Sequence, residues 1–266
     1  MPELIIHPWI IRRLPKNKFF NSLPVGVLPA RGRPFRGSLP CRGVSHLPRP
    51  KRLWPEPSAP DPDRFVYERS LRERGYARIA GTDEVGRGPL AGPVVAACVI
   101  LPPECDPQRY RDSKQLTHEQ RVVLAEELKA SGALIGVGIV AAVEIDRLNI
   151  LQASLRAMQL AVEKMPVAPD FLLVDGRHPV PLAIPQQALV KGDSRSASIA
   201  AASIIAKVAR DALMEAMHHE YPQYNFHRHK GYGTAEHCRL LQLHGPCPLH
   251  RRSFRPVREA LEKGEP

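Results

Sequence analysis

Apolar residues follow a strand-like pattern in five short segments of the chain. The runs at 77–84, 92–101 and 133–142 are apolar and mostly rich in β-branched residues, which predicts strands. Two shorter runs, at 171–176 and 187–193, have the same character, and each includes a Gly-Asp or Asp-Gly pair near its end. The pattern therefore predicts five strands, of which three end in acidic residues.

Three other segments repeat their apolar residues every three or four positions, which is typical of helices. Segment 116–131 carries Thr117 as a candidate N-cap and Gln120 as the residue that closes a capping box. Segment 143–165 predicts one amphipathic helix, and 198–222 predicts a long helix with an alanine-rich face that can pack closely on a sheet. Strands followed by alternating strands and helices predict a mixed α/β domain, with helices covering a sheet.

Residues 1–62 show neither the strand-like nor the helical spacing of apolar residues. Residues 1–62 hold 13 of the 28 prolines, and 11 Lys and Arg residues against three Asp and Glu residues. Proline removes backbone donors and breaks regular structure, so we expect residues 1–70 to form a disordered Pro/Arg-rich extension. The folded domain is then expected at 71–262, with its periodic part starting near Ala77. The extension could be a nucleic-acid-binding arm, a linker, or sequence upstream of the true start.

Composition narrows the class of protein. The 266 residues are 43% hydrophobic and contain no apolar run of about 18 residues, so no transmembrane helix and no membrane partner are expected. The N-terminus lacks the basic start of a secretory signal. The five cysteines are odd in number and include no CxxC pair, which favours a reducing cytoplasm over a disulfide framework. Of the net charge of +11, most lies in the extension, where it could attract phosphate or simply be solvated.

Four acids, Asp83, Glu84, Asp175 and Asp193, stand at the ends of three predicted strands. Ligand sites of α/β sheets lie at such strand ends, so these acids could converge on one site. Converging carboxylates repel unless a cation neutralises them, and oxygen ligands favour Mg²⁺ or Mn²⁺. The alternative is four unrelated surface acids in turns. The glycine-rich turn that follows Glu84 favours the shared site.

Six motifs carry a family resemblance. In chain order they read GTDEVGRGPLAGPVVAACVIL, DSKQL, LLVDG, KGDSRSASIAAASIIAKVARD, HKGYGT and HRRSFRPV. Together they resemble the bacterial ribonuclease HII (type 2 ribonuclease H) family over residues 77–260. The resemblance implies a ribonuclease H-like α/β fold, in which helices flank a mixed five-stranded sheet and a helical C-terminal region follows.

The same resemblance implies the activity. Members of the family are endonucleases that hydrolyse the RNA strand of RNA–DNA hybrids and nick 5′ of ribonucleotides embedded in duplex DNA, leaving 3′-hydroxyl and 5′-phosphate ends. We therefore expect these nucleic acids as partners, a monomer in the cytoplasm, and a role in removing ribonucleotides during DNA replication and repair. The cofactor implied is a divalent metal, Mn²⁺ or Mg²⁺, with two ions during catalysis. Such ions can activate water and stabilise the leaving oxygen.

The resemblance also assigns residues. The implied catalytic and metal-binding residues are the four acids, with Asp83 as the expected bridge between the ions. The glycine–arginine–glycine motif is implied to sense the ribose 2′-hydroxyl through main-chain groups, and a tyrosine is implied to stack at the RNA–DNA junction. The substrate-binding residues are accordingly Gly86, Arg87, Gly88 and Tyr232.

Several alternatives remain open from the sequence. Asp211 could support the site or pair with a nearby base on the helix surface, and Lys191, Lys207 and Lys230 could contact phosphate or solvent. The histidines and cysteines between 237 and 250 match no common zinc spacing. Two other functions are a non-catalytic nucleic-acid-binding protein and a type 3 ribonuclease H. The four acids argue against the first, and the lack of a periodic N-terminal domain argues against the second.

Overall fold

The computed structural model describes residues 63–106, 110 and 116–264. The predicted disorder of residues 1–62 and the Asp-Ser-Lys motif at 112–114 lie outside the described residues. Within the described ranges, no helix is both long enough and apolar enough to cross a membrane.

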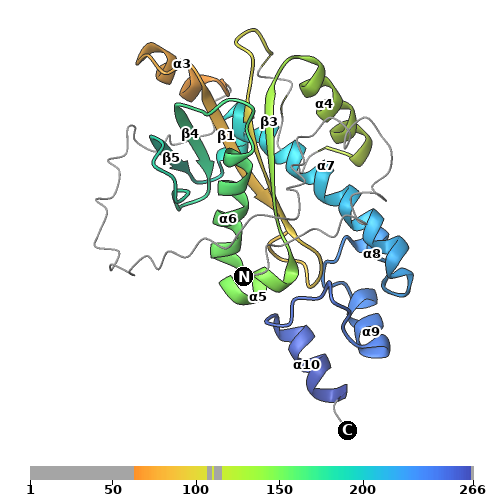
Figure 1. Ribbon diagram of the computed structural model, residues 1–266. Coiled ribbons are helices and arrows are strands. Elements are labelled where there is room, and N and C mark those ends of the chain that lie inside the picture. Colours follow the sequence, from red (N-terminus) through yellow and green to blue (C-terminus); the bar gives the residue numbers. More distant parts are fainter. Residues whose placement is uncertain (1–62, 107–109, 111–115, 265–266) are drawn as a thin grey trace, which may run out of the picture.

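One five-stranded mixed sheet forms the centre of the domain (Figure 1). Its strand order is β3-β2-β1-β4-β5; β2 runs antiparallel to β1 and β3, whereas β4 runs parallel to β1 and β5. The predicted mixed sheet of five strands is thus confirmed. The strands are β1 (Ile79–Val85), β2 (Val94–Ile100), β3 (Leu134–Val140), β4 (Phe171–Asp175) and β5 (Gln186–Leu189).

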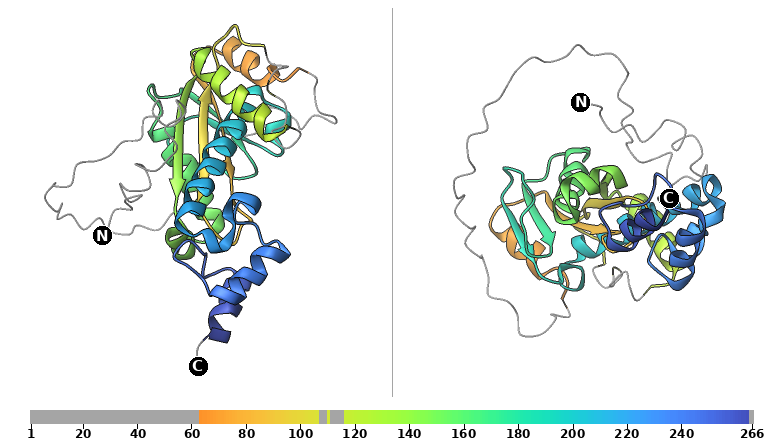
Figure 2. Two further views of the ribbon diagram at one scale, coloured as in Figure 1. Left: turned by 90° about the vertical axis from the view of Figure 1, so that its right-hand side faces the viewer. Right: turned by 90° about the horizontal axis from the view of Figure 1, so that it is seen from below.

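Helices cover both faces of this sheet. Alternate residues of β2 explain the two layers, because Val95 and Ala97 pack toward α4 and α7, whereas Ala96 and Cys98 pack toward α6. Figures 1 and 2 show the C-terminal helices gathered at one end of the sheet, beyond the end of α7. The helices are α3 (Val66–Glu73), α4 (His118–Ala130), α5 (Ala142–Leu148), α6 (Ile150–Glu163), η3 (Gly192–Ser194), α7 (Ala197–Glu220), η4 (Pro222–Tyr224), α8 (Phe226–His229), α9 (Ala235–His244) and α10 (Arg255–Gly264).

The close contact between β1 and the start of α7 depends on a glycine. A Cβ atom on Gly81 would lie 2.2 Å from the backbone of Ser198 and Ile199, so only glycine allows this approach. Gly81 precedes the first two acids by only two and three positions. The same contact therefore fixes α7 beside the acidic end of β1.

The folded domain begins earlier than the predicted boundary after residue 70, which falls inside α3. Tyr67 and Leu71 of α3 are buried against β1 and β4. Glu68 is also buried, and its Oε1 accepts hydrogen bonds from Ser196 Oγ (2.7 Å) and Ser198 N (3.0 Å) at the start of α7. The boundary prediction is wrong for residues 63–70 because these partners lie about 130 residues away and leave no local signal.

Two local predictions also need correction, and one is confirmed. The predicted helix 143–165 is two helices, because Asn149 adopts φ 70° and its side chain caps α6 by accepting from Leu151 N and Gln152 N. The predicted strand 187–193 ends at Leu189, so Asp193 lies in the short helix η3 instead. The capping box of Thr117 and Gln120 at the start of α4 is present as predicted.

Candidate active site

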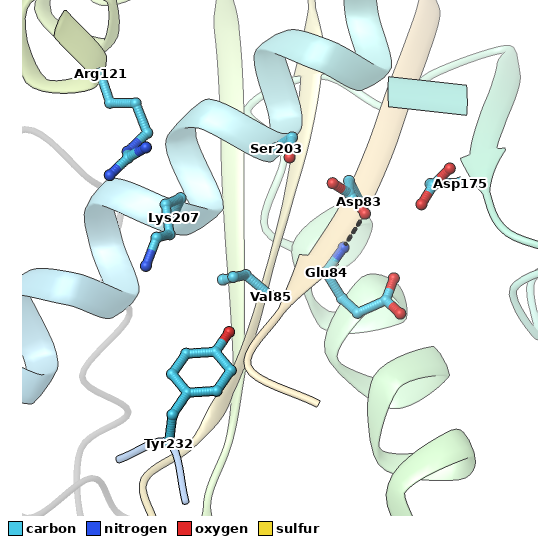
Figure 3. A pocket seen from close by; sticks show the side chains of 8 residues that line it. All are labelled: Asp83, Glu84, Val85, Arg121, Asp175, Ser203, Lys207 and Tyr232. Atoms are coloured by element: carbon cyan, nitrogen blue, oxygen red, sulfur yellow. Dashed lines mark hydrogen bonds between the residues drawn. The ribbon is translucent and has the colours of Figure 1, made fainter. Parts of the chain in front are cut away.

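A pocket of about 200 Å³ opens at the acidic end of β1 (Figure 3). Three of the four predicted acids line it, together with the predicted tyrosine. Figure 3 shows the acids on one side, with the basic side chains and the tyrosine opposite. The lining residues are Asp83, Glu84, Val85, Arg121, Asp175, Ser203, Lys207 and Tyr232.

The sheet brings the acids together. Parallel pairing aligns Thr82 of β1 with Val174 of β4, so Asp83 and Asp175, the next residues on each strand, lie side by side. Asp83 is buried, and its Oδ1 accepts the main-chain N–H of Glu84 at 2.7 Å. Although successive strand residues normally point to opposite faces, both Asp83 and Glu84 reach the pocket at this strand end.

Burial and mutual repulsion disturb the acids strongly. Burial, followed by the charges of Asp175 and Glu84, raises the pKa of Asp83 well above its ordinary value, and a hydrogen bond from Ser203 offsets only part of this. Burial raises the pKa of Glu84 to about 7, although Arg87 opposes the shift. A cation in the pocket would remove this repulsion, so the carboxylates fit a hard divalent ion.

Asp193 is close to the pocket without being part of its lining. Its charge contributes to the raised pKa of Asp83, and its side chain is buried. The preceding residue connects it to the other acids, because Gly192 N donates a hydrogen bond to Asp175 Oδ1 at 2.6 Å. In the part of the chain that the structure describes, no three acidic, histidine or cysteine side chains are arranged so that they could hold a metal ion, so an ion would have to draw the carboxylates closer together.

Helices supply the opposite wall with residues that the sequence analysis had not assigned. Ser203 lies one helical turn before Lys207 on α7, and Arg121 reaches the pocket from α4. Lys207 Nζ in turn pairs with Asp211 Oδ1 at 2.7 Å, which supports the pairing of Asp211 with a nearby base, but Asp211 is buried and does not lie on the helix surface as expected. The i, i+4 spacing of 203, 207 and 211 is the sequence signal that could have placed Ser203 here.

The other two lysines lie outside the pocket lining. Lys230 Nζ forms an ion pair with Glu215 Oε2 at 2.9 Å. Lys191 adopts a left-handed φ of 56° just before η3.

The glycine–arginine–glycine motif lies next to the pocket. Gly86 has φ 91°, and a Cβ atom there would collide with the Arg210 side chain at 2.2 Å. A Cβ atom on Gly88 would meet the ring of Tyr232 at 3.9 Å, so this glycine and the tyrosine are neighbours. Arg87 Nη1 donates to Glu84 Oε1 at 3.0 Å. Tyr232 is 43% exposed and therefore accessible to a ligand.

The histidine-rich segment 237–250 forms a hydrogen-bonded cluster. His237 Nε2 and His250 Nε2 lie 3.1 Å apart, and Cys247 Sγ lies 3.2 Å from His250 Nδ1. Burial lowers the pKa of both histidines to about 4, so both rings are neutral near pH 7. Their ring nitrogens take part in hydrogen bonds within the C-terminal region, to each other, to Tyr232 O and to Cys247 N.

The strand order and the acids at the ends of β1 and β4 define the class of protein, one with a ribonuclease H-like fold. A solved relative, the ribonuclease H2 of Pyrococcus horikoshii OT3, matches with a TM-score of 0.62 and 25% identity, over 70% of this chain and 98% of that one. The fold is also shared with a Bst-RNase HIII solved in complex with Mn²⁺, with a TM-score of 0.56, 20% identity and 71% of each chain covered.

The sequence comparisons identify the family. The family model described as Ribonuclease HII matches residues 80–257. The Ribonuclease HII of Desulfotalea psychrophila is 53% identical over 203 residues, covering 75% of this chain and 90% of that protein. The chain therefore belongs to the ribonuclease HII family, and it is a ribonuclease H that acts as an endonuclease on RNA–DNA hybrids. This confirms the resemblance and excludes the non-catalytic alternative.

Proposed function

We propose that this ribonuclease H also nicks duplex DNA 5′ of single embedded ribonucleotides, and that it serves ribonucleotide removal from DNA in the cytoplasm as a monomer. The observation that carries the proposal is the pocket itself. It places three carboxylates opposite an accessible aromatic ring, with the glycine–arginine–glycine motif adjacent to that ring. An enzyme that reads one ribonucleotide needs both a cutting site and a nearby reader of the sugar.

The four acids would hold two divalent ions, Mn²⁺ or Mg²⁺. The raised pKa values of Asp83 and Glu84 support this proposal, because burial, and after it the neighbouring carboxylates, disfavour their charged forms, and a bound cation would offset both effects. Asp83 adjoins Glu84 in the chain and lies beside Asp175 across the sheet, which suits the bridging role, and Asp193 would complete the shell from η3. When bound, the ions would supply Lewis-acid stabilisation of the charge that develops on the phosphate oxygens.

The remaining residues would bind and orient the nucleic acid. Lys207 and Arg121 face the pocket and can attract backbone phosphates. Tyr232 would stack on the sugar or base at the RNA–DNA junction, and main-chain groups at 86–88 would contact the 2′-hydroxyl, the group that distinguishes a ribose from a deoxyribose. Arg87 would stay paired with Glu84 until a phosphate competes for its guanidinium.

The test compares three duplexes that differ only in their sugars: all-DNA, an RNA–DNA hybrid, and DNA with one ribonucleotide. We expect cleavage of the hybrid, one nick 5′ of the single ribonucleotide, and no cut in the all-DNA duplex. The product ends should be 3′-hydroxyl and 5′-phosphate, which ligation can verify.

Metal dependence is tested on the same duplexes. Treatment with EDTA should abolish all cleavage, and either Mg²⁺ or Mn²⁺ should restore it. Cleavage of the hybrid without any nick at the single ribonucleotide would overturn the proposal and favour the specificity of a type 3 enzyme. Full cleavage in EDTA would refute the metal assignment.

A further inference from the structure

Arg251 is a fully buried arginine just before α10, and its guanidinium contacts main-chain carbonyl groups. Its Nη2 donates to Gly86 O at 2.6 Å, its Nη1 to Arg87 O at 2.9 Å, and both Nε and Nη2 donate to Gly92 O at 3.1 and 2.9 Å. Its own N–H donates to Leu90 O at 2.9 Å. One residue of the C-terminal region thus binds four carbonyls of the loop that follows β1.

Arg210 of α7, also fully buried, binds the rest of the same loop. It donates to Pro93 O (3.0 Å), to Ala91 O (3.3 Å) and to Lys230 O (3.0 Å), two residues before Tyr232. Burial and the nearby Arg210 lower the pKa of Arg251 to about 9, so its guanidinium still carries its charge at pH 7. Two buried positive charges are costly, and the carbonyls that offset this cost belong almost entirely to loop 86–93.

The direction of these carbonyls determines the direction of the neighbouring N–H groups. A trans peptide is planar, with its C=O and N–H pointing in opposite directions, and the described peptides of this chain are trans. Because Gly86 O and Arg87 O point to Arg251, the N–H groups of Arg87 and Gly88 point away from it. Gly88 borders the ring of Tyr232, which lines the pocket, so the loop segment that carries these two donors adjoins the pocket.

We propose that Arg251 is a positioning residue for ribose recognition: its guanidinium turns two consecutive peptides of loop 86–93, so that the N–H groups of Arg87 and Gly88 form a donor pair for an oxygen of the ribonucleotide. This inference rests on the proposed function. The exposed side chain of Arg87 is not needed for this role, whereas the buried side chain of Arg251 is. Lysine cannot replace it, because a single ammonium group cannot reproduce the planar fork that spans three carbonyls.

The first experiment compares Arg251→Lys with the matched control Arg252→Lys, which changes the exposed neighbouring arginine. For Arg251→Lys, kcat/KM at a single ribonucleotide should fall roughly 10- to 100-fold, because the loop spends less time in its competent orientation. Its Kd for the all-DNA duplex, which has no 2′-hydroxyl, should change less than about twofold. The control should match the parent protein in both measurements.

Two results would overturn the positioning role. One is an Arg251→Lys protein that keeps kcat/KM within about twofold of the parent. The other is a loss of affinity for all-DNA duplex that equals the loss in cleavage, because that would show general damage to the fold. If the parent protein cuts no ribonucleotide-containing duplex, the proposed function itself fails, which is a different outcome from a variant that cuts normally.

A second measurement needs no variant and covers the case in which Arg251→Lys does not fold. The amide resonances of Arg87 and Gly88 are followed by NMR while the parent protein binds duplex in metal-free buffer. They should shift more with the single-ribonucleotide duplex than with the all-DNA duplex, whereas the amide of Gly92, which donates to Leu249 O, should respond equally to both. Identical shifts of Arg87 and Gly88 with the two duplexes would refute the donor pair.

Discussion

Replacing Asp83 with asparagine distinguishes the contribution of this residue to cleavage from its effect on the stability of the fold. The amide oxygen of the new side chain can still accept the N–H of Glu84, which Asp83 Oδ1 now accepts at 2.7 Å, so the strand end should keep its geometry. The amide supplies no negative charge for a metal ion. We therefore expect Asp83→Asn to lose cleavage by more than about 100-fold and to remain folded, with duplex binding retained.

The same substitution should raise stability when no metal is present. The pKa of Glu84 rises from 4.5 to about 7 in the folded protein, which corresponds to roughly 3 kcal/mol at about 1.4 kcal/mol per pH unit. Asp83 is more deeply buried and lies among three other acids, so removing its charge should stabilise the fold in the same direction. For a domain of this size, each 1 kcal/mol gained should raise the melting temperature by roughly 2 to 4 °C.

The sign of the pH dependence follows from the raised pKa. An acid that holds its proton more tightly in the folded state destabilises folding increasingly as the pH rises above its unfolded value. The gain from Asp83→Asn should thus be near zero below about pH 4 and should grow until the pH exceeds the folded pKa. Wild-type protein in Mg²⁺ should recover much of the same stability, because ion binding relieves the repulsion.

The assay measures thermal unfolding in EDTA and in Mg²⁺ at pH 5, 7 and 8, alongside cleavage of the single-ribonucleotide duplex. Glu126→Gln is the matched control, because it neutralises an acid in the partly buried pair Glu126–Lys129 on α4, neither member of which lines the pocket. The control should change stability by less than about 1 kcal/mol and leave cleavage intact. Near-normal turnover of Asp83→Asn in Mg²⁺, or a lower melting temperature in EDTA, would refute the reasoning.

Three further predictions concern other parts of the chain. Deleting residues 1–62 should keep turnover at low salt within about tenfold of the parent protein and should weaken binding at high salt. Deleting residues 1–74 should destabilise the fold, because this deletion removes α3 and the Glu68 cap of α7. Turnover and melting temperature, measured on both deletions, test these expectations. Tyr232→Ala should lower cleavage at a single ribonucleotide roughly 10- to 100-fold at an unchanged melting temperature, whereas Tyr232→Phe should keep most of the cleavage activity. A Tyr232→Ala protein that loses stability but cleaves normally would show that the tyrosine has a structural role. Burial lowers the pKa of His237 and His250 to about 4, so their neutral rings contribute stability that is complete above about pH 6.5 and is lost as the pH falls toward 4. Urea titrations between pH 7 and pH 4 should therefore show an unfolding midpoint that falls with the pH. A midpoint that does not change with pH would contradict the pKa shifts.

Sequence patterns predicted helices and strands correctly where the residues that determine the element are close together in the chain. The capping box at Thr117 and Gln120 needs only residues within one helical turn, and it is present. The break at Asn149 was missed because the apolar spacing continues across it, while the change of backbone direction depends on one residue with positive φ. The strand prediction through Asp193 failed for a similar reason, since the apolar run outlasts the pairing of β5 with β4.

The sequence alone indicated the family, the five strands and four candidate acids, because motifs and apolar runs are local properties. Only the tertiary structure determined which charged side chains are buried and which groups form hydrogen bonds with them. Arg251 looks like any surface arginine in the sequence, yet it is fully buried against carbonyls up to 165 residues away. The burial of a charge depends on partners that folding brings from distant segments, and no local pattern records those partners.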